Sequence, residues 1–257
     1  MYLINIKNIK FFFMIDLKIA NRIEDIQKIA IFAQLKNDQL LTILKNAKII
    51  NLKKDQILFS QEQKVDNFYI VLDGLVKLSR LNSKGFEAII KIIDNGSLND
   101  IFSDNFSLSA TAMKNTNLLA IPSDIFKNYA EKNYNLMHNI LLEISTQNDD
   151  LVNQLSNLKI DDNKEKIGQF LLKNSLKKSK KNSDIDLEFS KSEIASYLGM
   201  RLETFSRILH QLKIEEKFSV KKNKIILTQE NTLCSYCNKE ISANCDMKNC
   251  NFCSQKN

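Results

Sequence analysis

The sequence has little cysteine, proline and histidine, and these shortages narrow the class of protein. Its 257 residues include one proline and two histidines, and all five cysteines lie in the last 24 positions. A secreted protein held by disulfides carries cysteines through its folded core, so we expect a cytoplasmic protein with a thiol-rich tail. No run of about 18 apolar residues occurs, so we expect no membrane-spanning helix and no membrane partner.

The motifs of common catalytic sites are also missing. The chain has no P-loop, no GxSxG nucleophile turn, no HExxH zinc pair and no dinucleotide fingerprint. Two histidines leave few candidates for acid–base catalysis. We therefore expect a protein that is not an enzyme.

The first 22 residues are expected to form an N-terminal extension. An apolar patch at residues 11–15 has lysines on both sides, and no small-residue cleavage site follows it. This pattern argues against a signal peptide. Either Met1 or Met14 can be the start of the protein.

Positive charge gathers in one part of the chain. The net charge is +7, and residues 160–230 hold 15 lysines and arginines against 11 acidic residues. A basic segment of this kind is a weak indication of a polyanionic partner. Charge alone leaves a plain basic surface as the alternative.

The hydrophobic pattern divides the first half of the chain into a helical and a β segment. Residues 23–48 have apolar side chains at helical spacing, and Asn37-Asp38 marks a turn or helix start between two pieces. Residues 49–121 alternate short apolar runs with turns such as Asp73-Gly74, which predicts a small antiparallel sandwich or barrel. Strands are expected at residues 56–59, 68–72, 75–78, 88–93 and 118–121. Pro122 ends this region, and a helix is expected from Ser123.

A narrow apolar seam follows. Its members are separated by alternating three and four residues, and they are Tyr134, Met137, Leu141, Ile144, Asn148, Leu151, Leu155 and Leu158. A helix that packs on its own domain needs a wider apolar stripe, so the seam predicts a parallel coiled-coil homodimer. Asn148 is at an a position of the heptad, where a single asparagine can fix the register.

The basic segment contains the pattern on which the functional prediction depends. Ser190 and Glu193 form a capping box for a helix over Lys191–Tyr197. Gly199 allows a tight turn, and a second helix begins near Arg201. Two short helices joined by such a turn indicate a helix-turn-helix, whose second helix enters the major groove of double-stranded DNA.

The outward face of this second helix offers side chains suited to base and phosphate contacts. Arg207 can pair with guanine, Glu203 can accept from cytosine, and Ser206 can bond several base edges. The candidate DNA-binding residues are Arg201, Glu203, Thr204, Ser206, Arg207, His210, Lys213 and Lys222. Residues 217–227 predict a two-stranded hairpin, which would be a wing beside the two helices.

With these motifs the chain resembles the CRP/FNR family of bacterial transcription regulators, over about residues 25–230. Residues 68–78 are similar to the family's β-roll signature, and Glu203, Ser206 and Arg207 match the E-x-x-S-R spacing of its FNR branch. The resemblance implies an α+β fold: an N-terminal β-roll (a cyclic-nucleotide-binding-like jelly roll), a long dimerisation helix and a C-terminal winged helix-turn-helix. It also implies a homodimer that binds a palindrome of TTGAT-type half-sites and contacts RNA polymerase.

Pattern and resemblance together give a division into five segments. They are an N-terminal extension at 1–22, a β-roll sensor-like domain at 23–132, a dimerisation helix at 133–160, a winged helix-turn-helix at 161–230 and a cysteine-rich tail at 231–257.

The cyclic-nucleotide pocket of the family is not matched. Leu98, Asn99 and Asp100 replace its Gly-Glu pair, and Leu108 is found where the phosphate-binding arginine belongs. A buried phosphodiester without that cation loses its strongest hydrogen bonds, so we expect no binding of cAMP. The roll can still hold another small molecule.

The tail is the other candidate sensor. It has two C-x2-C pairs with one cysteine between them: Cys234, Cys237, Cys245, Cys250 and Cys253. Thiolates at this spacing can close a zinc site or hold a [4Fe–4S] cluster. The FNR branch often senses oxygen through such a cluster on N-terminal cysteines, which this chain lacks, so those ligands do not carry over.

Two hypotheses for the signal follow. The first is a regulator gated by a redox, oxygen or nitrosative signal at the tail cysteines, through a metal centre or a thiol switch. The alternative is a regulator with a small-molecule effector in the β-roll and a structural zinc in the tail.

Overall fold

The computed structural model describes residues 16–83, 85–98, 102–160, 162–176, 184–186, 189–216, 218–221, 224–226, 232–238 and 241–242. The chain forms two compact units, Met1–Leu151 and Val152–Asn257, and the division falls inside its longest helix. Our predictions for Asn99, Asp100, Lys222, Cys245, Cys250 and Cys253 lie outside the described residues.

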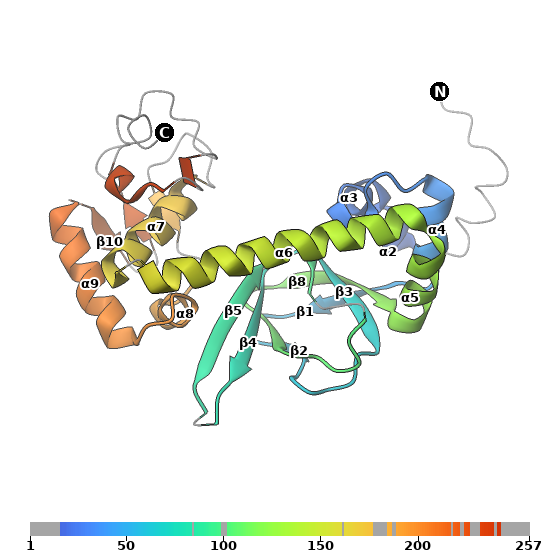
Figure 1. Ribbon diagram of the computed structural model, residues 1–257, viewed down its shortest axis with the longest axis horizontal. Helices are drawn as coiled ribbons and strands as arrows, with labels where there is room; N and C mark the ends of the chain where they lie inside the picture. The colour runs from blue at the N-terminus through green and yellow to red at the C-terminus, as the bar shows by residue number, and fades with distance from the viewer. Residues whose placement is uncertain are drawn as a thin grey trace. The chain divides into compact units, whose positions relative to one another are not determined.

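Two four-stranded antiparallel sheets form the roll of the first unit (Figure 1). One has the order β1-β8-β3-β6, from β1 (Lys48–Leu52), β3 (Asn67–Asp73), β6 (Gly96–Ser97) and β8 (Thr116–Pro122). The other has the order β2-β7-β4-β5, from β2 (Ile57–Phe59), β4 (Val76–Leu81), β5 (Glu87–Ile93) and β7 (Ser109–Ala112). Apolar side chains fill the roll, and the rings of Phe59 and Phe106 stack with centroids 3.7 Å apart.

The five predicted strands are confirmed, but three others were not predicted. Strand β6 has only two residues, and β7 consists of small residues without an apolar run. Strand β1 begins at Lys48, the last residue of the segment predicted to be helical, and its other residues lie in the predicted β segment. This strand pairs with β8 over residues Lys48 to Leu52. Hydrogen bonds to a strand so distant in sequence cannot be predicted from the local strand propensity.

The helical prediction for residues 23–48 is right in type and in the helix start at Asn37-Asp38, but the first of its two pieces consists of a short helix and a separate 3-10 turn. The segment holds α3 (Ile23–Gln27), the 3-10 turn η1 (Ala30–Phe32) and α4 (Asn37–Leu44), preceded by α2 (Leu17–Ala20). These helices share a core with the roll and with α5 (Ser123–Lys132), where the rings of Phe68 and Phe126 stack at 4.6 Å. Helix α5 begins directly after Pro122, as predicted.

An ion pair joins the N-terminal helices to the last residue of β3. The Arg22 guanidinium lies 2.6 Å from the Asp73 carboxylate, and Asn117 donates to the same group. The hydrogen bond from Arg22 lowers the pKa of Asp73 below its ordinary value. The pair therefore favours this arrangement at neutral pH.

Gly74, in the turn between β3 and β4, has no room for a side chain. Its φ is +116°, and a Cβ there would overlap the backbone and side chain of Thr116. Gly96 has a similar φ of +112° with open space around it. We expect Gly74→Ala to lower the free energy of unfolding by about 1–3 kcal/mol more than Gly96→Ala, because only Gly74 adds overlap to the backbone strain. Urea unfolding of the two variants measures this difference, and equal losses would contradict it.

Helix α6 (Tyr134–Ile160) packs its first turns against the first unit. Leu136 and Ile140 are buried, and the Asn139 side-chain amide donates to the carbonyl oxygens of Ile31 and Ala33 at 3.2 and 2.7 Å. Among the described residues, no helix is long and apolar enough to cross a membrane.

The second unit is a winged helix-turn-helix. Its helices are α7 (Asn163–Leu176), α8 (Lys191–Tyr197) and α9 (Leu202–Glu215), and its three-stranded sheet has the order β10-β11-β9, from β9 (Asp184–Asp186), β10 (Ser219–Lys221) and β11 (Lys224–Ile226). A 3-10 turn, η2 (Cys234–Tyr236), follows. The predicted fold class, α+β with a β-roll, a long helix and a winged helix-turn-helix, is confirmed.

Candidate DNA-binding site

The turn between α8 and α9 is fixed by short-range hydrogen bonds. The backbone N–H of Ser190 donates to the Glu193 carboxylate at 2.7 Å, and the backbone N–H of Glu193 donates to the Ser190 hydroxyl at 3.2 Å. This is the predicted capping box. Gly199 has a φ of +68°, and the N–H of Met200 donates to the carbonyl of Ala195 at 2.9 Å. The residues that start α9 are thereby held in place.

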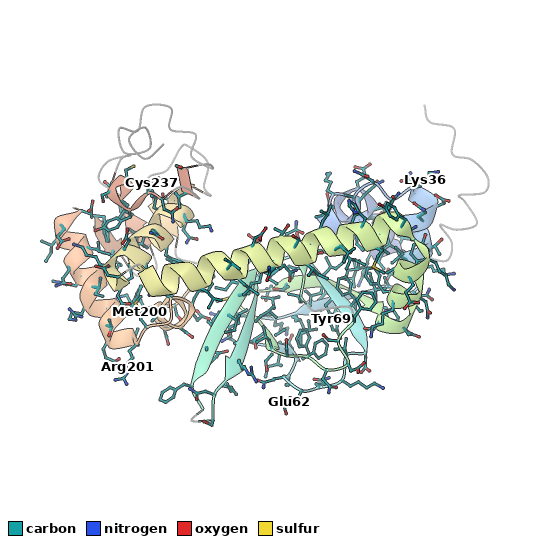
Figure 2. All side chains as sticks on the ribbon, in the orientation of Figure 1. Lys36, Glu62, Tyr69, Met200, Arg201 and Cys237 are labelled. Carbon is teal, nitrogen blue, oxygen red and sulfur yellow. The ribbon has the colours of Figure 1, made fainter. Side chains whose placement is uncertain are left out.

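The inner face of α9 packs into the core of the second unit. Phe205, Ile208, Leu209 and Leu212 are buried there, as predicted, together with Ile194 of α8. The opposite face is left for a partner. Figure 2 shows Arg201, at the start of α9, with its side chain pointing away from the unit.

The predicted DNA-binding residues of α9 lie on this outward face. Exposed side chains are those of Arg201, Glu203, Arg207, His210 and Lys213, and half-buried ones are those of Thr204 and Ser206. The geometry brings together the Glu203, Ser206 and Arg207 motif on the first two turns of α9. These turns are the part of a recognition helix that contacts base edges.

The wing forms as a hairpin beside these helices. Strands β10 and β11 pair antiparallel with Val220 opposite Ile225, and β9 pairs with the other edge of β11. The hairpin predicted at residues 217–227 is confirmed for its described residues. Strand β9 was not predicted.

A second cluster, at the C-terminal end of α9, was missed by the sequence reasoning. Lys164 of α7 lies 2.5 Å from the carboxylate of Glu215, and the Ser235 hydroxyl donates to the Glu216 carboxylate at 3.4 Å. The Tyr236 ring covers Gly168 of α7, where a Cβ would overlap the ring. A glycine inside a helical pattern is the signal that could have indicated such a close contact.

Two of the five tail cysteines belong to this region. We call Leu233, Cys234, Ser235, Tyr236 and Cys237 the cysteine turn. It lies against α7, and both thiols are buried with 4% of each residue exposed (Figure 2 labels Cys237). Among the described residues no group of three or more histidine, cysteine or acidic side chains could hold a metal.

The thiols of the cysteine turn suit half of a thiolate metal site. Cys234 begins the 3-10 turn η2 and Cys237 is its C-cap, so the two thiols are three residues apart in the chain. Two soft sulfur ligands from one turn are the usual building block of tetrahedral zinc and of iron–sulfur centres. The described residues therefore fit such a group as one pair of ligands.

The seam of α6 is largely exposed in the single chain. Exposed members are Tyr134, Leu141, Ile144, Asn148, Leu151 and Leu155, with 81% of Tyr134 and 58% of Leu141 accessible. Met137 is the exception, because it is half-buried against the core of its own unit. The side chain of Leu158 lies outside the described residues. Apolar residues exposed at heptad spacing form a surface suited to a second helix.

The region that matches the family's nucleotide pocket has an apolar side chain where a cation would be needed. Leu108 is half-buried and packs against the core of the roll. The hydroxyl of the next residue, Ser109, accepts from the backbone N–H of Gln61 at 2.9 Å.

The fold and the exposed face of α9 define a class of protein: a DNA-binding transcription regulator with a β-roll and a winged helix-turn-helix. Two family models match the chain, "Cyclic nucleotide-binding domain" at residues 49–133 and "Crp-like helix-turn-helix domain" at residues 165–236. The chain belongs to the CRP/FNR family of transcription regulators. This is a family of regulators rather than of enzymes.

Curated relatives support this assignment at low identity. The "Transcriptional activator protein Anr" of Pseudomonas protegens is 24% identical over 190 residues, which cover 72% of this chain and 78% of that protein. The "Fumarate and nitrate reduction regulatory protein" of Vibrio cholerae is 26% identical over 190 residues, 72% of this chain and 75% of the relative. The "Nitrogen fixation regulation protein FixK" of Bradyrhizobium diazoefficiens is 28% identical over 172 residues, 64% and 71% of the two chains.

Solved structures show the same fold. FixK2 from Bradyrhizobium japonicum superposes with a TM-score of 0.66 at 20% identity and covers 74% of this chain and 96% of its own. A CRP/FNR-family regulator from Thermus thermophilus gives a TM-score of 0.62 at 18% identity, with 74% and 97% covered.

Proposed function

We propose that the protein is a sequence-specific regulator that binds palindromic DNA with TTGAT-type half-sites as a homodimer. The observation that carries this proposal is the outward face of α9, where Glu203, Ser206 and Arg207 keep the E-x-x-S-R spacing. Arg207 can make a bidentate pair with guanine and Glu203 can accept from cytosine, so the helix can distinguish base pairs in the major groove. Contact of the bound dimer with RNA polymerase would then raise or lower transcription.

The exposed seam supports the homodimer. Leu141 and Ile144 are exposed in the single chain and become buried only when another helix covers them. A second copy of α6 has the complementary heptad pattern. Two recognition helices related by a two-fold axis require an inverted repeat in the DNA. The seam and the palindrome are therefore linked parts of one proposal.

Fluorescence anisotropy on short duplexes tests the binding. The duplexes carry two TTGAT half-sites as an inverted repeat over a series of spacings, and a scrambled duplex of equal composition is the control. We expect one spacing to bind at least 1,000-fold more tightly than the scrambled duplex, within the usual range of specific over nonspecific binding. Equal affinity for all duplexes at the same salt concentration would reject sequence-specific function.

We also propose that a redox, oxygen or nitrosative signal acts through the tail cysteines, with a [4Fe–4S] cluster or zinc as the candidate group. The buried thiols of Cys234 and Cys237 support this, because they give a pair of sulfur ligands inside the DNA-binding unit. A bound cluster would supply a centre that oxidants can alter, whereas zinc would supply a redox-inert cross-link.

Anaerobic purification with iron, sulfide and zinc analysis distinguishes these groups. We expect one of them in stoichiometric amount, and its loss in a variant with Cys245, Cys250 and Cys253 all replaced by serine. That variant is preferable to deletion of the last 24 residues, because deletion also removes Cys237 and Ile241 from the core. Full metal content in the triple variant, or none in the native chain, would contradict a metal centre built from the tail.

The second candidate is an effector other than cAMP in the roll with a structural zinc in the tail. The observation that favours it is the match of residues 49–133 to the cyclic nucleotide-binding domain. Leu108 replaces the arginine that would bind a phosphodiester, so an effector at this position would be largely apolar. Colourless protein with stoichiometric zinc would favour this candidate.

A further inference from the structure

The roll has a polar recess at the place where β1 ends and β8 begins. We call it the β1–β8 recess; its volume is about 380 Å³, and it is lined by residues 51–53, Gln56 and residues 115–117. This volume lies within the range of small-molecule sites in proteins. The recess is separate from the region that matches the family's nucleotide pocket, because neither Leu98 nor Leu108 lines it.

Hydrogen bonds hold the two turns that form the walls of the recess. The N–H of Lys53 donates to the side-chain oxygen of Gln56 at 2.6 Å, and the N–H of Ala112 donates to the carbonyl oxygen of Gln56 at 2.9 Å. In the other wall the hydroxyl of the buried Thr116 donates to the carbonyl oxygen of Lys114 at 2.8 Å. A ligand therefore meets walls that are already ordered, which lowers the entropic cost of its binding.

Amide side chains in the recess keep hydrogen-bonding capacity for a ligand. Asn51 of β1 pairs with Asn117 of β8, whose amide donates to Asp73 at 3.2 Å. Within the described part of the chain, the side chains of Asn51 and Asn115 have no hydrogen-bond partner. Asp73 adds little charge here, because it is paired with Arg22. An amide both donates and accepts, so it suits hydroxyl groups, which do the same.

Three lysines give the recess a positive charge. We call them the rim lysines: Lys53 lines the recess, Lys54 and Lys114 are next to it in sequence, and all three are exposed. Among the residues that the structure describes, neither Lys53 nor Lys54 has an ion-pair partner. Residues 51–56 and 114–117 hold these three lysines against one acid, Asp55, so their net charge is +2. Ammonium groups form strong charge-assisted hydrogen bonds with phosphate.

We propose that the β1–β8 recess binds a small phosphorylated sugar or polyol, a phosphomonoester that carries several hydroxyl groups. Its phosphate contacts the rim lysines, and its hydroxyls contact the amides of Asn51 and Asn115. Inorganic phosphate alone leaves the amides without a ligand contact, and a neutral sugar leaves the lysines without an anion. The inference goes beyond the proposed function, because the recess lies in the roll and requires no DNA.

Isothermal titration calorimetry on the full chain at about 0.15 M salt tests this binding. The probes are glucose 6-phosphate, ribose 5-phosphate and glycerol 3-phosphate. Inorganic phosphate and glucose are the comparison ligands, because each carries only one of the two kinds of group. We expect at least one phosphomonoester to bind at one site per chain with a Kd below about 1 mM, at least tenfold more tightly than either comparison ligand.

Substitutions separate the roles of the lysines and the amides. Lys53→Ala removes a charge-assisted hydrogen bond and should weaken binding of the phosphomonoester at least tenfold. Asn115→Ala removes an amide that contacts hydroxyls, so it should lower the preference over inorganic phosphate at least threefold. Lys132→Ala, which changes an exposed lysine of α5 outside the recess, is the matched control and should keep the native affinity. Thermal unfolding checks that each variant folds.

Each contrary outcome has a distinct meaning. No saturable binding of any of the three phosphomonoesters overturns the inference. Inorganic phosphate that binds as tightly as they do makes the recess a general anion site and rejects the assigned ligand class. Equal losses in Lys53→Ala and Lys132→Ala show that binding follows the overall charge instead of the recess. None of these titrations contains DNA, so their failure leaves the proposed function intact, and failure of sequence-specific DNA binding leaves this inference intact.

Discussion

Replacing Ile144 with glutamate is expected to turn the proposed homodimer into a monomer. Ile144 is at a d position of the seam and half of it is exposed in the single chain, so its burial depends on the partner. Two glutamates would face each other there, and the desolvation and repulsion of the carboxylates should cost about 3 kcal/mol or more, roughly a 150-fold loss in dimer affinity. Affinity for the palindrome should fall with it, because two linked half-sites become two independent ones.

Sedimentation velocity over a concentration series measures the change. Thr146→Glu is the matched control, since Thr146 is exposed on α6 two residues away and outside the seam. It should remain a dimer. If Ile144→Glu is as dimeric as Thr146→Glu, the seam is not the dimer interface.

Arg207→Ala is expected to remove most of the sequence preference while leaving general DNA affinity nearly intact. A bidentate pair with guanine accounts for about 1–3 kcal/mol of discrimination, so specific binding should weaken roughly 5- to 150-fold per half-site. Nonspecific binding comes from phosphate contacts spread over several lysines and changes little. Anisotropy titrations on specific and scrambled duplexes at several salt concentrations separate the two effects.

Lys213→Ala is the comparison for Arg207→Ala. Its exposed side chain is near the end of α9, where it can meet phosphates. This variant should weaken both duplexes by a similar factor and reduce the salt slope by about one. An equal loss on both duplexes in Arg207→Ala would assign that arginine to the phosphates instead.

The sequence predicted best where structure is set by neighbouring residues. Helix α8 has the predicted bounds because its capping box and Gly199 lie within ten residues. Strand β7 was missed because Ser-Ala-Thr-Ala has no apolar alternation, and only its pairing with β2 and β4 makes it a strand. Within residues 23–48 the helix start at Asn37-Asp38 was predicted, but the separate turn η1 was not, since the core contacts of this segment come from α5, α6 and the roll.

The candidate site also has one part that the local sequence predicts and one part that it does not. The face of α9 with Glu203, Ser206 and Arg207 follows from spacing alone, because helix periodicity decides which residues point outward. The cluster with Lys164, Glu215 and the cysteine turn could not be predicted, since its members come from segments about 50 and 20 residues apart in sequence. Long-range pairs of this kind depend on how the elements pack.

The burial of Ile241 and Cys237 has a consequence for the gene. A nonsense or frameshift mutation between codons 216 and 241 would delete side chains from the hydrophobic centre of the DNA-binding unit. Such a lesion would lower the abundance of the folded regulator through proteolysis, even though every residue of α9 is still translated. The reading frame is therefore constrained up to Ile241 by folding, well past the recognition helix.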